Sequence, residues 1–179
     1  MDLIAQFVDR ARRSPKRIVY PEGDDERIVK AAALAVQRGI AKPTVLGKPE
    51  VVKALASRAA VDLTGVGIVD PDSPAETEAF AKDYSASRPE ISVAVAKRLV
   101  KRPLFFSSMM VKTGTADGMV GGVASTTASL IQAAGLTVGF EPGVSTASSF
   151  FIMVVPECLG EKDKVLVFAD AAVCIDPNA

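Results

Sequence analysis

A glycine turn followed by hydroxyl side chains is the stretch of this sequence whose residue types could bind an anion. Gly121-Gly122 end a short apolar segment, and Ser125, Thr126 and Thr127 precede a predicted helix, Ala128–Ala134. Backbone N–H groups at a helix start lack partners within the helix and can hold a phosphate. The same residues also suit a tight turn and an ordinary N-cap, and no dinucleotide or P-loop motif accompanies them. The stretch is therefore a candidate phosphate site with a purely structural alternative.

Two further polar side chains could belong to such a site. Arg88 could clamp phosphate through two parallel hydrogen bonds, or could be a solvated arginine at a helix end. Gln132, on the helix after the hydroxyl run, can donate a hydrogen bond but carries no charge. No catalytic residue can be assigned from these patterns.

Composition excludes several classes of function. The 179 residues include no histidine, so the commonest general base and metal ligand is missing, and we expect no metal and no bound cofactor. The formal net charge is zero with no basic run, which argues against nucleic acid. The N-terminus is amphipathic and carries acidic residues, so it is not a signal peptide, and no apolar run could span a bilayer. Cys158 and Cys174 match no metal or redox spacing; two lone thiols favour the cytoplasm, with one disulfide as the alternative.

Short apolar strands alternate with helical patterns through the first 140 residues. Asp24 is predicted to cap a helix that Gly39 closes, and Ser73–Glu76 reads as a capping box. Helices are predicted over 2–13, from 24, over 50–58, 73–85 and 92–100, and from 103, and strands over 16–20, 44–46, 66–69 and 117–120. This alternation predicts an α/β fold in which a parallel sheet has helices on both faces.

The carboxyl ends of parallel strands are where open α/β sheets bind ligands. Three predicted strands end in Pro21-Glu22-Gly23, Asp70-Pro71 and Gly121-Gly122. We therefore expect the site among these turns.

The pattern changes after Pro142-Gly143. Ser148–Val155 and Lys164–Phe168 read as two apolar strands joined by a polar turn, an antiparallel hairpin. We expect an α/β domain over residues 1–143 and a hairpin over 144–179 that begins a second, truncated domain. Because an apolar hairpin is not stable alone, it should pair with another chain, giving a homodimer or self-association through residues 148–168, or belong to something longer.

Several segments, taken together and in order, resemble the phosphate acetyl/butyryl transferases, over nearly the whole chain. They are KRIVYPEGDDERIVKAAALAVQRGIAKPTVLG, IVDPDSPAETEAFAKDY, MMVKTGTADGMVGG, PGVSTASSFFIM and VLVFADAAVCIDPNA. The resemblance implies the isocitrate/isopropylmalate dehydrogenase-like fold, with two α/β domains and a cleft between them. It also implies transfer of an acetyl group between coenzyme A and inorganic phosphate, giving acetyl phosphate, in a cytosolic dimer that needs no metal.

This sequence departs from the family pattern in two ways. Family chains are nearly twice as long, and their later segments carry the serine, arginine and aspartate regarded as catalytic; the chain alone is therefore expected to be inactive. Arg88 matches one family arginine, whereas Gln132 stands where the pattern S-T-A-D-x-L-R-P-A has another, with Ser129 at its aspartate. Two alternatives to an acyltransferase follow: a module that binds acetyl-CoA or acyl phosphate without turnover, and an interaction domain that uses the hairpin.

Overall fold

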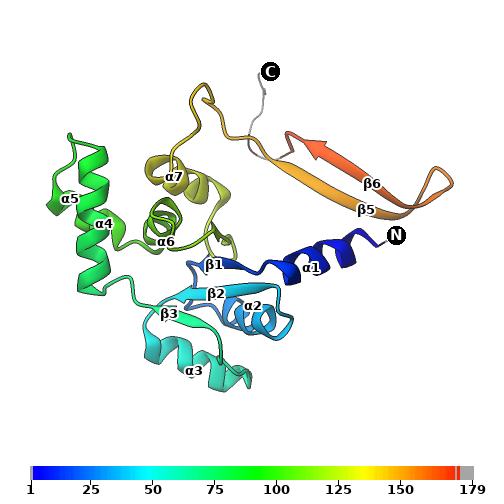
Figure 1. Cartoon of the computed structure of the whole chain (residues 1–179), viewed down its shortest axis with the longest axis horizontal. Coiled ribbons are helices and arrows are strands. Elements are labelled where there is room, and N and C mark those ends of the chain that lie inside the picture. The colour runs from blue at the N-terminus through cyan, green and yellow to red at the C-terminus, as the bar shows by residue number, and fades with distance from the viewer. Residues whose placement is uncertain (1, 172, 174–179) are drawn as a thin grey trace. The chain divides into compact units, whose positions relative to one another are not determined.

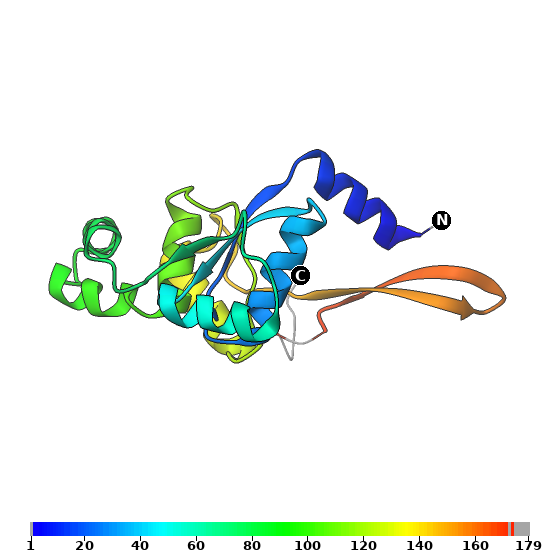
Figure 2. The ribbon, with the colours of Figure 1, turned by 90° about the horizontal axis from the view of Figure 1, so that it is seen from below.

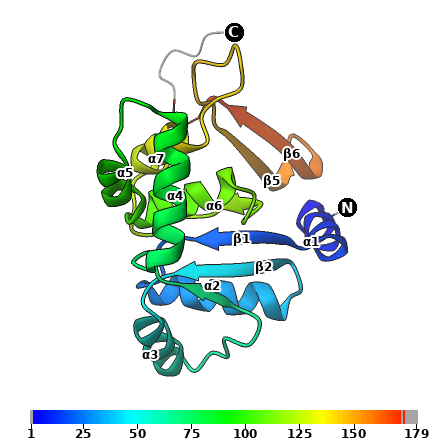
Figure 3. The ribbon, with the colours of Figure 1, turned by 60° about the vertical axis from the view of Figure 1, so that its left-hand side comes forward.

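A computed structural model describes residues 2–171 and 173 of the chain. The chain divides into two compact units, one formed by Ala11–Gly139 and the other by Met1–Arg10 with Phe140–Ala179. Figures 1 to 3 show the elements of each unit from three directions. The predicted division after residue 143 stays a prediction.

The larger unit is built on one parallel sheet (Figure 1). Its strands lie in the order β3-β2-β1-β4, and every neighbouring pair is parallel. They are β1 Lys16–Tyr20, β2 Ala41–Leu46, β3 Gly67–Val69 and β4 Gly118–Met119. The predicted parallel sheet is confirmed, and β1, at its centre, pairs with strands on both sides.

Helices cover both faces of this sheet, as predicted. Tyr20 and Val45 pack with α2 (Glu26–Gln37) and α3 (Pro49–Ala59) on one face. The alternate residues Val19 and Leu46 pack on the other face with three helices, α4 (Pro74–Ser87), α5 (Val93–Val100) and α6 (Pro103–Lys112). Since successive strand residues point to opposite faces, two adjacent residues of each strand supply two separate cores. The last helix of this unit, α7 (Thr127–Thr137), packs against α6.

Asp117 ties β4 to β1. Its carboxylate accepts hydrogen bonds from the backbone N–H and the guanidinium of Arg17, the shortest 2.6 Å from Nη2 to Oδ1, and its own N–H donates to the Arg17 carbonyl. These hydrogen bonds hold the pKa of Asp117 well below its usual value. Asp117 therefore has a structural role, because it fixes the position of the two-residue strand β4 beside β1.

One predicted cap is wrong by a single position. Asp25, not Asp24, caps α2, accepting from the backbone N–H and the guanidinium of Arg27. The contacts with Arg27 lower the pKa of Asp25 to about 2. A carboxylate placed before the first turn also interacts favourably with the positive end of the helix dipole.

The other unit contains the predicted antiparallel hairpin. β5 (Phe150–Cys158) pairs with β6 (Glu161–Ala169), and Phe151 lies opposite Phe168. Leu159 and Gly160 both have positive φ, 53° and 78°, as a two-residue hairpin turn requires. β6 begins at Glu161 and not at the predicted Lys164, so the turn is shorter than predicted.

Helix α1 (Leu3–Arg13) begins the chain, as its amphipathic pattern predicts. Across the residues that the structure describes, no helix has the length and hydropathy of a bilayer span. Cys158 is a free thiol, and Cys174 lies outside the described residues.

Candidate functional site

The carboxyl ends of β1 and β4 meet because these two strands are neighbours. Pro21 and Glu22 follow β1, and residues 120–126 lead from β4 into α7. Two turns a hundred residues apart in sequence thus form one corner of the sheet.

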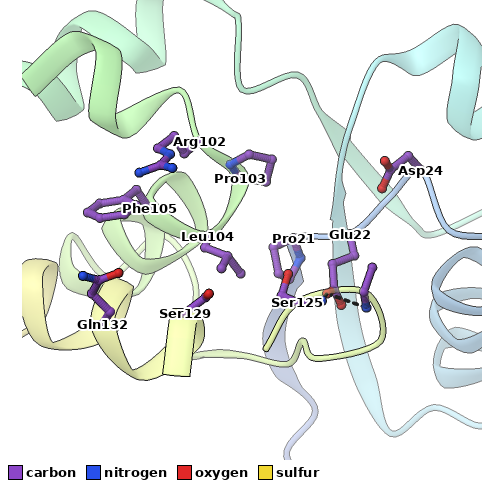
Figure 4. Close-up of a pocket in the computed structure, with 11 residues that line it drawn as sticks. Pro21, Glu22, Asp24, Arg102, Pro103, Leu104, Phe105, Ser125, Ser129 and Gln132 are labelled. Atoms are coloured by element: carbon purple, nitrogen blue, oxygen red, sulfur yellow. Dashed lines mark hydrogen bonds between the residues drawn. The ribbon is translucent and has the colours of Figure 1, made fainter. Parts of the chain in front are cut away.

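Glu22 fills the loop that follows β4 (Figure 4). One carboxylate oxygen, Oε2, accepts from the backbone N–H groups of Gly122 at 2.9 Å and Val123 at 3.0 Å. The other, Oε1, accepts from those of Ala124 at 2.9 Å and Ser125 at 2.6 Å. Only 6% of Glu22 is exposed to solvent. Burial raises its pKa, but the hydrogen bonds from Ala124, Ser125, Val123 and Gly122 outweigh burial, so the pKa lies below its usual value.

This arrangement corrects the prediction of a phosphate cradle in the loop. The N–H groups of residues 122–125 do converge on an anion, but the anion is the protein's own carboxylate. The glycines have structural reasons as well: Gly122 has φ of 113°, and a Cβ on Gly121 would lie 3.0 Å from the Pro21 ring. Glu22 therefore fixes the conformation of this loop, and the N–H groups of the loop are not free for phosphate.

A pocket of about 370 Å³ lies beside this loop. The residues that line it come from the end of β1, the start of α6 and the start of α7: Pro21, Glu22, Asp24, Arg102, Pro103, Leu104, Phe105, Ala124, Ser125, Ser129 and Gln132. In the view of Figure 4, Arg102, Phe105, Ser129 and Gln132 gather at one end, and Asp24 lies at the other. The pocket therefore has a cationic end and an acidic end.

Arg102 supplies the positive charge of this pocket. It is the residue before Pro103, where α6 begins, and its guanidinium carbon lies 5.9 Å from the centroid of the Phe105 ring. Within the described part of the chain, no carboxylate or carbonyl oxygen pairs with this guanidinium. Arg102 is itself the N-cap residue of α6 and makes no side-chain cap hydrogen bond there. Free guanidinium donors and the positive end of a helix thus occur together at one end of the pocket.

The predicted hydroxyl residues Ser125, Thr126 and Thr127 have different positions in the structure. Ser125 lines the pocket with its side chain, as does Ser129 one turn into α7. Thr126 is the N-cap of α7: its Oγ1 accepts from the Ser129 N–H at 3.2 Å and lies 2.9 Å from the Ser129 hydroxyl. Thr127 begins the helix and does not line the pocket. Capping therefore accounts for Thr126, Ser125 hydrogen-bonds Glu22, and the Ser129 hydroxyl contacts Thr126 at the pocket lining.

Only one of the two other predicted site residues, Gln132 and Arg88, lines the pocket. Gln132 lines the pocket. Arg88 does not: its Nε donates to the Leu136 carbonyl at 3.1 Å, and its guanidinium lies 5.6 Å from the centroid of the Tyr84 ring. Arg88 therefore joins the end of α4 to α7 outside this pocket, and its role as a phosphate clamp stays a prediction.

Sequence reasoning missed Glu22 and Arg102. The turn Pro21-Glu22-Gly23 was expected at the ligand edge of the sheet, but the loop partner of Glu22 depends on strand order. Arg102 carried one usable signal, its position directly before a proline that starts a helix. Among the described residues, no cluster of histidine, cysteine, aspartate and glutamate could hold a metal ion.

Comparison with known proteins gives one consistent result. Residues 2–179 match the family described as phosphate acetyl/butaryl transferase. A phosphate acetyltransferase of Acetivibrio thermocellus is 36% identical over 181 residues, covering 100% of this chain and 54% of that protein. One of Nitratidesulfovibrio vulgaris is 39% identical over 175 residues, covering 97% of this chain and 24% of that protein. The chain thus spans about half the length, or less, of the curated relatives it matches.

Solved structures agree. A phosphotransacetylase from Streptococcus pyogenes has a TM-score of 0.87 at 30% identity, covering 99% of this chain and 54% of that one. The EutD phosphotransacetylase from Staphylococcus aureus has a TM-score of 0.85 at 26% identity, covering 100% of this chain and 53% of that one.

Proposed function

Because the chain belongs to the phosphate acetyl/butaryl transferase family, we propose that it serves transfer of an acetyl or short acyl group between coenzyme A and inorganic phosphate. The match over residues 2–179 is the observation that carries this proposal. The relatives named phosphate acetyltransferase support acetyl phosphate as the product.

The proposed reaction needs no histidine. A phosphate oxygen, anionic at neutral pH, attacks the thioester carbonyl, the new C–O bond forms, and the C–S bond breaks. The electron pair leaves with the sulfur as a thiolate, which then takes a proton from solvent. Positioned donors that hold phosphate and the developing oxyanion supply most of the catalysis in such a step.

The pocket at the ends of β1 and β4 is the phosphate side of the proposed site. It offers the Arg102 guanidinium, the Ser129 hydroxyl and the Gln132 amide. We propose that the remaining catalytic groups lie in segments of the kind that the curated relatives carry beyond the part that matches this chain. The larger unit would then be one wall of a cleft in an isocitrate/isopropylmalate dehydrogenase-like fold, and the hairpin part of a second domain.

An assay of coenzyme A release tests this function. Acetyl-CoA and phosphate are supplied to the chain alone, and to the chain fused to the segment that a curated relative carries beyond the match. We expect acetyl phosphate and free thiol from the fusion. The chain alone should be slower by several orders of magnitude, because removing groups that act as a unit costs that much.

Each other outcome has a defined meaning. A fusion that folds but forms no acetyl phosphate contradicts the proposed function. Equal rates place the catalytic groups within these 179 residues. A control without phosphate measures thioester hydrolysis.

We also propose that the protein is a cytosolic homodimer that associates through the hairpin. Phe150 and Val167 are each 65% exposed, and Phe151 is 53% exposed. Apolar surface of this kind marks an interface.

The association makes a direct prediction. Light scattering should report a dimer of the 179-residue chain at micromolar concentration. The double change Phe150→Ser and Val167→Ser, which removes apolar area from one face of the hairpin, should shift the mass toward the monomer. The matched change Lys162→Ser should leave the mass unchanged. A wild-type monomer throughout this range contradicts the proposal.

A further inference from the structure

We propose that the Arg102 guanidinium is the cationic group that holds a phosphate group in the pocket between β1, α6 and α7. This assignment rests on the proposed function and names the side chain that recognises its anionic substrate. A phosphate group occurs both as inorganic phosphate and within coenzyme A, and the shared chemistry is an oxyanion that accepts several hydrogen bonds.

The state of Arg102 is the first argument. Three other arginines of the same unit donate to protein oxygens: Arg17 to Asp117, Arg27 to Asp25, and Arg88 to the Leu136 carbonyl. Arg102 lines the pocket with no hydrogen-bond or ion-pair partner among the described residues. Its contact with the Phe105 ring restricts its orientation without using its N–H donors. A planar fork of free donors held at a pocket wall suits bidentate binding of a phosphate.

Elimination of the alternatives is the second argument. The N–H groups of residues 122–125 donate to Glu22, so the loop cannot accept a second anion without displacing that carboxylate. The Nε of Arg88 donates to the Leu136 carbonyl on α7, and Arg88 does not line the pocket. Lys and Arg side chains other than Arg102 are absent from the pocket lining.

The neighbours of Arg102 complete a suitable donor set. Gln132 offers amide hydrogens, and the Ser129 hydroxyl can donate to a phosphate oxygen while it accepts from the Thr126 hydroxyl. The uncapped N-terminus of α6 adds a favourable field at the same end. Asp24 at the other end repels a dianion, so the phosphate should lie toward α6 and α7.

Calorimetric titration of the 179-residue chain tests the assignment, with inorganic phosphate and coenzyme A as separate ligands. We expect Arg102→Gln to weaken binding of one or both by about ten- to a hundredfold, the range that loss of charge-assisted hydrogen bonds produces. Arg102→Lys, which keeps the charge and loses the fork, should fall between wild type and Arg102→Gln. Arg98→Gln, the same change at an exposed position on α5, is the matched control and should bind as wild type.

The outcomes separate this inference from the proposed function. Weakened phosphate binding supports a site for the free ion, and weakened coenzyme A binding alone supports a site for a phosphate of that ligand. Unchanged binding of both ligands to folded Arg102→Gln overturns the assignment and leaves the function intact. A loss confined to Arg88→Gln would return the role to Arg88. A wild-type chain that binds neither ligand also overturns the assignment, whereas the proposed function is contradicted only by a folded fusion that forms no acetyl phosphate. Thermal melts of each variant show that it is folded, since Arg102 is exposed.

Discussion

Glu22→Gln should lower the free energy of unfolding by on the order of 3 kcal/mol, since each hydrogen bond to a charged group contributes about 1.5–3 kcal/mol. The carboxylate accepts from four backbone N–H groups, two on each oxygen. A glutamine of the same shape keeps one oxygen, but its NH2 group must face two of the N–H donors. Those donors, which are partly buried with Glu22, then lack an acceptor, which costs more than the loss of a hydrogen bond alone.

The pH dependence of this stabilisation has a definite sign. The pKa of folded Glu22 lies below its usual value of 4.5, so the folded state binds the proton less tightly than the unfolded chain. The stabilisation is therefore fully present above that usual value and is lost as the pH falls through the folded pKa. We expect the difference between wild type and Glu22→Gln to be constant near neutral pH and to shrink in acid.

Urea unfolding at several pH values measures both effects. Glu50→Gln, the same change at an exposed position on α3, is the control and should have little effect. A Glu22→Gln variant as stable as Glu50→Gln would show that the loop is not held by this carboxylate.

Gln132→Arg should strengthen phosphate binding by about tenfold, the gain that one charge-assisted contact can give. Gln132 is exposed and lines the same pocket as Arg102, so an arginine there adds a second guanidinium to the cationic end without disturbing the core. Between exposed charges such a gain depends on ionic strength, so it should diminish as salt is added.

The double variant Arg102→Gln with Gln132→Arg sharpens this prediction. It moves the guanidinium from α6 to α7 at unchanged net charge, and it should recover part of the phosphate binding that Arg102→Gln loses. Gln37→Arg, the same change at an exposed position on α2, is the control for net charge alone. Equal gains from Gln37→Arg and Gln132→Arg would mean that the pocket does not hold the anion.

The sequence pattern was sufficient to predict the parallel sheet and the two layers of helices that cover it. Short apolar strands separated by amphipathic helices leave little alternative to a parallel sheet covered on both faces. Helix starts were predictable to within a residue, since Ser92 and Thr126 cap where polar side chains precede apolar periodicity. The choice between Asp24 and Asp25 depended on the backbone conformation of the turn, which composition does not reveal.

The site was predictable only in part, because it depends on which strands are neighbours. The pattern placed Ser125 and Gln132 near a strand end, and both line the pocket. It could not show that β4 lies beside β1, so it could not show that Glu22 occupies the glycine loop. It also could not show that Arg88 donates to the Leu136 carbonyl on α7, because that partner lies 48 residues away along the chain.

The position of a bound phosphate analogue tests the central claim most directly. Arsenate has the shape and charge of phosphate, and its anomalous scattering would locate it in crystals of the chain. We predict one site in the pocket, with arsenate oxygens within hydrogen-bond distance of the Arg102 guanidinium and the Glu22 carboxylate still bound to the loop after β4. Arsenate in that loop in place of Glu22, or at Arg88 with the pocket empty, would contradict the account.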